Sequence, residues 1–174
     1  MALSGCSESG SSTEREGEIY LIPQGYVGRV FIVHDVPGGE PLEYENDVRV
    51  FRIPEDGFLL SQSAPNEGWI EAHRLRYFYV DDDGKRTEIL GRWSGAVHDT
   101  EQNRSDTQLR ILDGGIGTFQ IGTSHCDLVQ TNLYVGTLQD LLNQTDNFDI
   151  YSERGIEGVN PEIVQEACEV SDAK

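Results

Sequence analysis

The chain has 174 residues, and its 31 acidic residues outnumber its 13 Lys and Arg to leave a formal net charge of −18. A chain of this length forms one ordinary domain or two small ones. The negative charge repels nucleic-acid phosphates, and no apolar run approaches the roughly 18 residues of a membrane-spanning helix, so neither nucleic-acid binding nor a transmembrane segment is expected.

The first residues carry the most informative short motif. Leu3-Ser4-Gly5-Cys6 resembles the lipobox of bacterial lipoproteins, in which small residues precede a Cys that becomes acylated. The resemblance implies a lipid anchor at Cys6. A secretory signal also needs about 7–15 apolar residues before the cleavage site, and only Met1 and Ala2 precede this motif. Either the signal segment was trimmed, which we favour, or Cys6 is a chance residue in a disordered tail.

The stretch after Cys6 has the composition of a linker. Residues 7–17 contain no large apolar side chain, so they cannot bury enough surface to offset the entropy lost on ordering. We therefore expect residues 1–17 to form a lipobox remnant and flexible tether. Residues 18–174 are expected to form a single β-rich domain, with a family-like part at 18–91 and a less regular part at 92–174.

Short apolar runs separated by turns begin at Glu18. Residues 48–53 and 75–80 alternate with period two, which is typical of strands that bury different residues on their two faces. Tight connections between the runs favour antiparallel pairing. The pattern predicts an antiparallel β-sandwich-like domain. The expected strands of this part are 19–22, 27–33, 48–53, 58–60, 75–80 and 87–90.

The second half is less regular and includes one or two short helices. Thr137 with Asp140 three residues later resembles a capping box and predicts a helix at 138–143. The run Asn160-Pro161-Glu162 predicts a second helix start. Residues 101–106 are expected to be a polar loop. The remaining expected strands are 97–100, 133–135 and a hairpin of 109–112 with 118–121 across Asp113-Gly114-Gly115.

One sequence pattern covers residues 19–90. Its first and most specific part is Leu21-Ile22-Pro23-x-Gly25-Tyr26-x-Gly28-x-Val30, followed by Pro41-x-x-Tyr44, Val50-x-x-Ile53-Pro54-x-x-Gly57, the Trp69 region and Tyr77-x-Tyr79-Val80. The pattern resembles a family of uncharacterised bacterial secreted or lipoprotein-like domains. That family has no assigned activity, so the resemblance implies an extracytoplasmic location and a β-rich fold but no catalytic residues.

The first motif also has a plain structural interpretation. Gly25 and Gly28 bracket a hairpin-like connection that needs positive φ or close backbone approach. We expect Tyr26 to be a packed aromatic residue whose hydroxyl binds a backbone carbonyl.

Candidate catalytic residues occur as sequence neighbours, in His34-Asp35, His98-Asp99 and His125-Cys126-Asp127. Adjacent residues on a strand point to opposite faces, so these neighbours are poor candidates for dyads. A thiol enzyme needs Cys and His to meet in space, and Cys126 could meet His98 or His34. A hydrolase using His and Asp or Cys126 is therefore the alternative function.

Metal and cofactor motifs are weak, and we expect neither a metal nor a cofactor. The Asp81-Asp82-Asp83-Gly84 cluster suits Ca²⁺ chemically, which leaves a Ca²⁺-stabilised binding domain as a third option, but a hairpin turn is the simpler interpretation. Gly114-Gly115-x-Gly117 precedes a strand-like run instead of the helix that a phosphate cradle needs.

Two cysteines remain if Cys6 is acylated. Cys126 and Cys168 would then form an even pair in a compartment where disulfides persist, so we expect a bridge between them. The leading function is a non-enzymatic binding or scaffolding module, lipid-anchored through Cys6 outside the cytoplasm, with an unidentified envelope partner or ligand. An exposed aromatic patch from Trp69, Trp93 or Tyr26 would favour such a module. The acid excess fits either a salt-tolerant surface or ordinary solubility.

Overall fold

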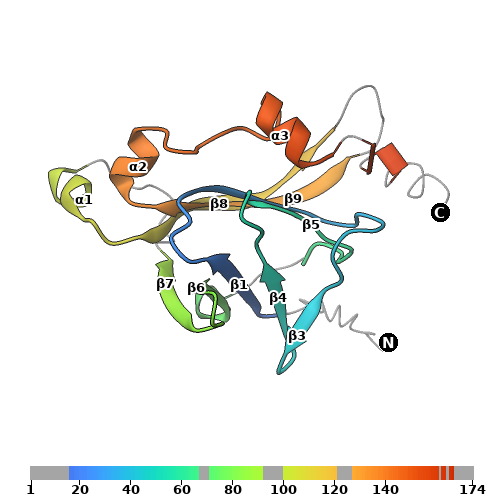
Figure 1. The fold of residues 1–174 in the computed structure, drawn as a ribbon, viewed down its shortest axis with the longest axis horizontal. Helices are drawn as coiled ribbons and strands as arrows, with labels where there is room; N and C mark the ends of the chain where they lie inside the picture. Colours follow the sequence, from blue (N-terminus) through green and yellow to red (C-terminus); the bar gives the residue numbers. More distant parts are fainter. Residues whose placement is uncertain are drawn as a thin grey trace, which may run out of the picture.

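A computed structural model describes residues 16–66, 71–91, 100–120, 127–160, 162–163 and 165–166. These residues form a mainly β structure with a few short helices (Figure 1). The strands are β1 (Glu18–Pro23), β2 (Gly28–Val33), β3 (Glu43–Glu45), β4 (Val48–Arg52), β5 (Phe58–Leu60), β6 (Leu75–Val80), β7 (Arg86–Gly91), β8 (Arg110–Phe119) and β9 (Leu128–Gly136). The helices are α1 (Glu101–Ser105), α2 (Leu138–Leu142) and α3 (Glu153–Gly158), with a 3₁₀ turn at Ala72–Arg74.

The strands form one mixed sheet in the order β3-β4-β1-β6-β7-β8-β9-β2-β5. Strand β1 is parallel to both β4 and β6, and β2 is parallel to β5. The expectation of a purely antiparallel sheet is therefore wrong. The reason is that consecutive strands such as β1 and β2 do not pair with each other but enter opposite halves of the sheet, so parallel neighbours arrive by crossover connections.

The connection between β1 and β2 shows why the hairpin expectation failed. Gly25 and Gly28 do have positive φ, at 81° and 144°, as expected. A Cβ at Gly28 would lie 2.8 Å from the Cβ of Asp146, so close packing also requires glycine there. The turn directs β2 away from β1 and toward β9. The Tyr26 hydroxyl donates a hydrogen bond to the carbonyl of Arg29, which confirms the structural role expected for this residue.

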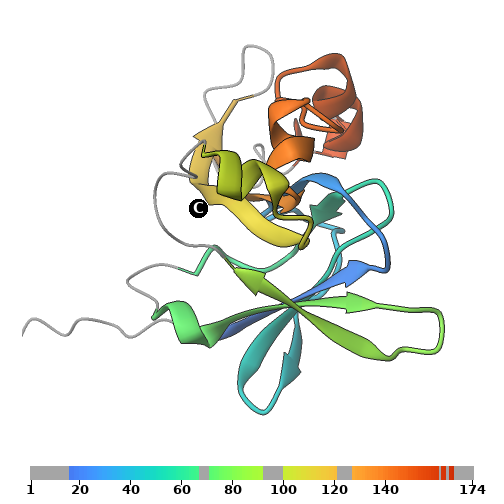
Figure 2. The same ribbon diagram turned by 90° about the vertical axis from the view of Figure 1, so that its left-hand side faces the viewer.

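The main core lies between the two halves of the sheet. Figure 2 shows β1, β4, β6 and β7 on one side and β8 and β9 on the other. The alternation of β4 and β6 places Phe51, Tyr77 and Tyr79 in this core. The main core consists of Tyr20, Ile22, Val30, Ile32, Phe51, Ile53, Leu59, Tyr77, Tyr79, Ile89, Ile111, Leu133 and Val135.

The outer faces of the two halves are covered differently. Helices lie over the half that contains β8, β9 and β2, where Phe31 and Phe58 pack with Ile150 and Val159 (Figures 1 and 2). On the other half, Ile19, Leu21, Val50 and Phe78 form a small cluster against which Val48 and Val80 pack. The Arg76 guanidinium stacks 4.7 Å above the Phe78 ring.

The glycines near position 114 form part of a strand and not the expected turn. Strand β8 runs without interruption through Gly114 and Gly115, which pair with Leu133 and Asn132 of β9. A Cβ on Gly114 would lie 2.9 Å from the Asn132 carbonyl oxygen, so glycine allows the two strands to approach closely.

The helix predictions were partly correct. The capping box of Thr137 and Asp140 is present and begins α2. Residues 162–163 and 165–166 are helical after Asn160, as expected. The expected polar loop at 101–106 instead contains α1, whose first turn is capped by the Thr100 hydroxyl. Helix α3, capped by Ser152, was not expected. In the part of the chain that the structure describes, no helix is long and apolar enough to span a bilayer.

Candidate functional site

Buried polar side chains gather at one end of the main core. This polar cluster, comprising Glu18, His34, Ser61, Ser63 and Asn66, has side chains that are nearly inaccessible to solvent. Strand phase explains the arrangement, because Glu18 faces inward with Tyr20, and His34 continues the inward phase of Val30 and Ile32. Polar groups inside a core cost free energy unless they are hydrogen-bonded, so each one requires a partner.

Glu18 is held by neutral donors. The Tyr20 hydroxyl donates to its carboxylate across 2.5 Å, and the Asn66 amide donates across 2.8 Å. The same Asn66 amide also donates to the carbonyl of Glu16. The Tyr20 ring stacks on Tyr77 with centroids 4.9 Å apart, which fixes the hydroxyl beside the carboxylate.

His34 lies in the same end of the core and contacts hydroxyl groups on both ring nitrogens. Its Nε2 is 3.0 Å from the Thr131 hydroxyl, and its Nδ1 is 3.5 Å from the Ser63 hydroxyl. Burial is the main cause that lowers the His34 pKa to about 4; a hydrogen bond with the Ser63 backbone opposes the shift, and the positive charge of Arg49 adds to it. The imidazole is therefore neutral at pH 7.

Arg49 supplies the positive charge next to this cluster. Its guanidinium donates to the Glu16 carboxylate and, across 2.8 Å, to the carbonyl of Ala64. These bonds connect the start of β1 to the segment that follows β5. The polar cluster consists of two hydrogen-bonded groups, one around Glu18 and Asn66 and one around His34, Ser61 and Ser63.

The geometry around His34 differs from that of a hydrolase. A nucleophile needs a base whose second nitrogen is oriented by a carboxylate or amide, and the Thr131 hydroxyl takes that place here. His34 is buried and its neighbour Asp35 is exposed, so the two do not form a dyad. Among the described residues, this arrangement fits a structural role for His34.

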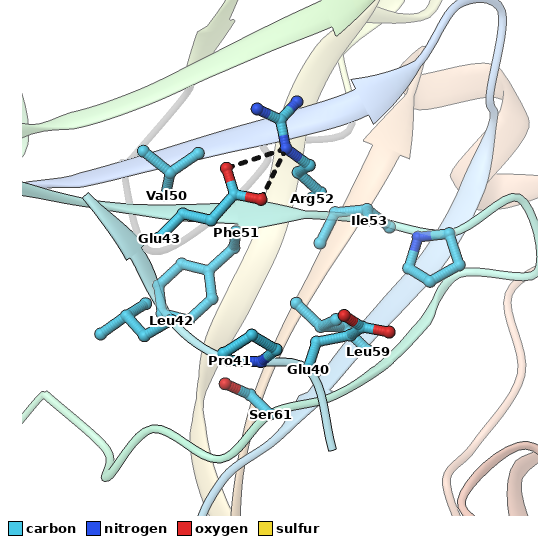
Figure 3. Close-up of a pocket in the computed structure, with 11 residues that line it drawn as sticks. Glu40, Pro41, Leu42, Glu43, Val50, Phe51, Arg52, Ile53, Leu59 and Ser61 are labelled. Carbon is cyan, nitrogen blue, oxygen red and sulfur yellow. Dashed lines mark hydrogen bonds and ion pairs between the residues drawn. The ribbon is translucent and has the colours of Figure 1, made fainter. Parts of the chain in front are cut away.

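A groove opens beside the polar cluster, between β4 and β5. Its cavity volume is about 320 Å³, at the small end of the usual range for ligand pockets. Figure 3 shows its residues, which come from the start of β3 and the segment before it, from β4 with Ile53 and Pro54, and from β5 with Ser61. The lining consists of Glu40, Pro41, Leu42, Glu43, Val50, Phe51, Arg52, Ile53, Pro54, Leu59 and Ser61.

The groove joins the main core to solvent. Phe51, Ile53 and Leu59 belong to the main core, and Leu42 packs against it, so the apolar wall of the groove is the core itself. At the rim, the Arg52 Nε donates to both carboxylate oxygens of Glu43 at 3.0 Å.

Ser61 links the groove to the polar cluster. It lines the groove, and its hydroxyl lies 2.8 Å from the Ser63 hydroxyl. Ser61 also pairs with Glu40 in an isolated parallel bridge, which connects β5 to the chain leading into β3. The groove therefore lies where the two edges of the nine-stranded sheet approach each other.

A second groove lies on the outer face of the other half of the sheet. Its cavity volume is about 330 Å³, and Arg76, Arg86 and Glu45 line it together with Phe78. Both of these arginines already have partners, because Arg86 pairs with Glu45 and Arg76 pairs with Glu88. Paired charges on a shallow surface make this groove a weaker candidate than the one that reaches the core.

Many residues singled out from the sequence lie outside the described residues. These are Cys6, Trp69, Trp93, His98, His125, Cys126 and Cys168. The lipid attachment at Cys6 and the Cys126–Cys168 bridge stay predictions. Among the described residues, no group of three or more His, Cys, Asp or Glu could hold a metal ion.

The Asp81-Asp82-Asp83-Gly84 run forms the expected turn between β6 and β7. The Asp81 carboxylate accepts hydrogen bonds from the backbone N–H groups of Asp83 and Lys85. Gly84 has a φ of 78°, which suits glycine.

The polar cluster and the groove were not identified from the sequence. A signal for the cluster did exist: Glu18 and His34 extend the inward phase of strands whose other inward residues are apolar. The groove had no comparable signal, because it depends on β5, at one edge of the sheet, approaching β3 and β4 at the other edge.

Comparison with known proteins places the chain in an uncharacterised group. Residues 14–127 match the model of a family of unknown function, DUF6843, which confirms the resemblance to uncharacterised domains over residues 19–90. No curated protein matches the chain. A crystal structure of a predicted lipoprotein from Bacillus anthracis is similar, with a TM-score of 0.52 and 21% identity over 88% of this chain and 94% of the other. At this identity, the similarity shows a shared fold.

Proposed function

We propose that this chain, which belongs to the DUF6843 family of unknown function, is an exported, lipid-anchored envelope protein with a non-enzymatic binding function. The single observation that carries the binding function is the groove between β4 and β5, because it opens the main core to solvent at the meeting point of the sheet edges. Apolar pockets with a few converging polar groups are the usual form of small binding sites.

The proposed anchor is Cys6, with residues 1–17 as its tether and residues 18–174 as one domain. Support comes from the Leu3-Ser4-Gly5-Cys6 motif and from the absence of large apolar residues in 7–17. The similar fold belongs to a protein described as a predicted lipoprotein, which agrees with this location. A bacterial lipoprotein carries more than one acyl chain, and stable anchoring requires that.

The anchoring proposal is tested in cells. The gene is expressed with its native upstream region and labelled with palmitate, and a Cys6→Ala variant serves as the control. We expect label and membrane association for the original sequence and neither for the variant. Equal labelling of the two proteins would overturn the anchor.

The proposed bridge between Cys126 and Cys168 is tested by mass. Exported proteins occupy compartments where disulfides persist, which supports the pairing. Intact mass is measured after alkylation of the folded protein, with and without reductant. We expect these two thiols to react only after reduction, and reaction without reductant would end the proposal.

The binding proposal is tested with the neutral fluorescent dye Nile red as a probe. Replacing Leu42 with Trp places a larger side chain in the groove, so we expect Leu42→Trp to weaken dye binding about tenfold. The control is Tyr44→Trp, since Tyr44 is 54% exposed and lies outside the groove lining. If the original protein and both variants bind Nile red equally, the dye does not bind in the groove.

A further inference from the structure

We propose that the groove binds an extended polypeptide segment, which pairs with the backbone of Arg52 and carries alternating apolar and basic residues. This inference rests on the binding function proposed for the groove and names the class of its ligand. It is carried by the hydrogen-bond register of β4, by the shape of the groove walls and by the charge at the rim.

The register of β4 directs the Arg52 backbone toward the groove. Backbone N–H groups of Arg49 and Ile53 donate to β1, to the carbonyls of Gly17 and Leu21. Along a strand, successive N–H groups point to opposite sides, so the N–H and carbonyl of Arg52 point away from β1. They face the side on which β3 pairs with β4.

Strand β3 does not extend far enough to occupy these groups. The pairing of β3 with β4 ends at Glu43 opposite Val50. Continuing that register would bring residue 41 opposite Arg52, and Pro41 has no N–H to donate. The chain instead leaves the β4 edge, and Glu40 pairs with β5, where its N–H donates to the Leu60 carbonyl at 2.7 Å.

The gap that results has the form of an interrupted sheet. One wall is the β4 edge at Arg52, and the other wall contains Leu59 and Ser61 of the opposite sheet edge (Figure 3). An extended segment that paired with Arg52 would alternate its side chains between two faces. Its inward side chains would contact Phe51, Ile53 and Leu59, so they should be apolar.

Charge at the rim sets the preference for the outward side chains. Glu40 and Glu43 contribute two negative charges and Arg52 one positive charge. Arg52 is already paired with Glu43, which leaves the Glu40 side of the rim acidic. The net charge of −18 adds a long-range attraction for cations. Basic outward residues are therefore favoured over acidic ones.

The experiment uses fluorescein-labelled octapeptides on the full chain. The first probe alternates Val and Lys, the second alternates Val and Glu, and the third is the Val-Lys peptide with alternate backbone nitrogens methylated. Anisotropy measures each affinity. We expect the Val-Lys peptide to bind, and methylation that removes the pairing N–H groups to weaken binding about tenfold, the effect of one good hydrogen bond.

Two variants separate backbone pairing from side-chain effects. Arg52→Pro removes the N–H that faces the groove, whereas Arg52→Ala keeps it and removes the side chain. We expect Arg52→Pro to weaken Val-Lys binding about tenfold and Arg52→Ala to bind this peptide at least as tightly as the original protein. The methylated peptide gives the same information on the unaltered protein if the proline variant does not fold.

The outcomes distinguish the ligand class from the binding function. Peptide binding that ignores methylation, or tighter binding of the Val-Glu peptide, would overturn the inference. Nile red binding that depends on Leu42 without any peptide binding would also overturn it, while the proposed binding function would stand. If Leu42→Trp does not weaken Nile red binding, the proposed binding function itself is contradicted.

Discussion

At one end of the main core, Ile22, Val30 and Val135 have no exposed surface and belong to the apolar cluster. At the other end, the inward positions of the same strands hold Glu18 and His34. Apolar burial stabilises the first end directly, whereas the second end is stable only while its hydrogen bonds are intact. The groove reaches the second end through Ser61. The comparison therefore separates the part of the core that is stabilised by apolar packing from the part that depends on hydrogen bonds.

The largest expected effect is at the apolar end. Ile22→Ala removes methyl groups that are completely buried, so we expect the free energy of unfolding to fall by about 3–4 kcal/mol. Urea unfolding measures the loss. Leu90→Ala is the control, because Leu90 is 48% exposed and should cost less than about 0.5 kcal/mol. If Ile22→Ala lowers the free energy of unfolding by less than about 1 kcal/mol, the apolar end is not closely packed around this side chain.

The next effect belongs to the polar end and depends on pH. The folded His34 pKa is about 4, below the ordinary value of 6.5, so the unfolded chain binds the proton more readily. The neutral imidazole makes its full contribution to the free energy of unfolding above about pH 6.5, and this contribution is lost as the pH falls toward about 4. The loss is on the order of 3 kcal/mol over that range. Urea unfolding at pH 7 and pH 4 measures it.

Two variants assign this pH dependence to one end of the core. His34→Gln has no group that titrates in the range, so we expect a flatter dependence of unfolding free energy on pH. Ile22→Ala should lower stability at both pH values and keep the original slope. If the unfolding free energy of His34→Gln depends on pH as strongly as that of the original protein, other titrating groups cause the effect.

The same two regions show what the sequence could predict. Period-two alternation correctly grouped Tyr77 with Tyr79, and Phe51 with Ile53, on one face of each strand, because strand geometry alone decides which side chains share a face. The grouping of side chains within one strand was therefore predictable from local pattern. The candidate site was not, since its residues come from strands whose pairing is parallel and distant in sequence. Gly114 was misassigned for a related reason: only its neighbour across the sheet reveals why glycine is required.

A smaller effect is expected for the hydroxyl that supports Glu18. Tyr20→Phe removes a 2.5 Å hydrogen bond from a buried carboxylate and leaves the ring stacking on Tyr77 in place. We expect a loss of about 1–3 kcal/mol, the usual cost of a buried polar group that loses its partner. Tyr44→Phe is the matched control, since the Tyr44 hydroxyl is exposed and its contact with Glu16 is 3.5 Å long. Equal losses in the two variants would mean that the Glu18 carboxylate is not desolvated.

The smallest expected effect lies outside the core, in the ion pair of Arg86 and Glu45. The hydrogen bond from Arg86 is the main cause that lowers the Glu45 pKa, but both side chains reach solvent, so the pair should contribute less than about 1 kcal/mol. A double-mutant cycle with Arg86→Ala and Glu45→Ala measures the coupling free energy. Because salt screens exposed pairs, we expect this coupling to decrease in 1 M NaCl.

The same salt series resolves the meaning of the acid excess. A surface with a net charge of −18 repels itself at low ionic strength, so a salt-tolerant surface should make the whole protein more stable as NaCl is added. An ordinary soluble surface should show little change. The coupling of Arg86 with Glu45 decreases in both cases, which makes it an internal measure of screening. Rising stability together with falling coupling would therefore identify long-range repulsion, and not the local ion pairs, as the dominant charge effect outside the core.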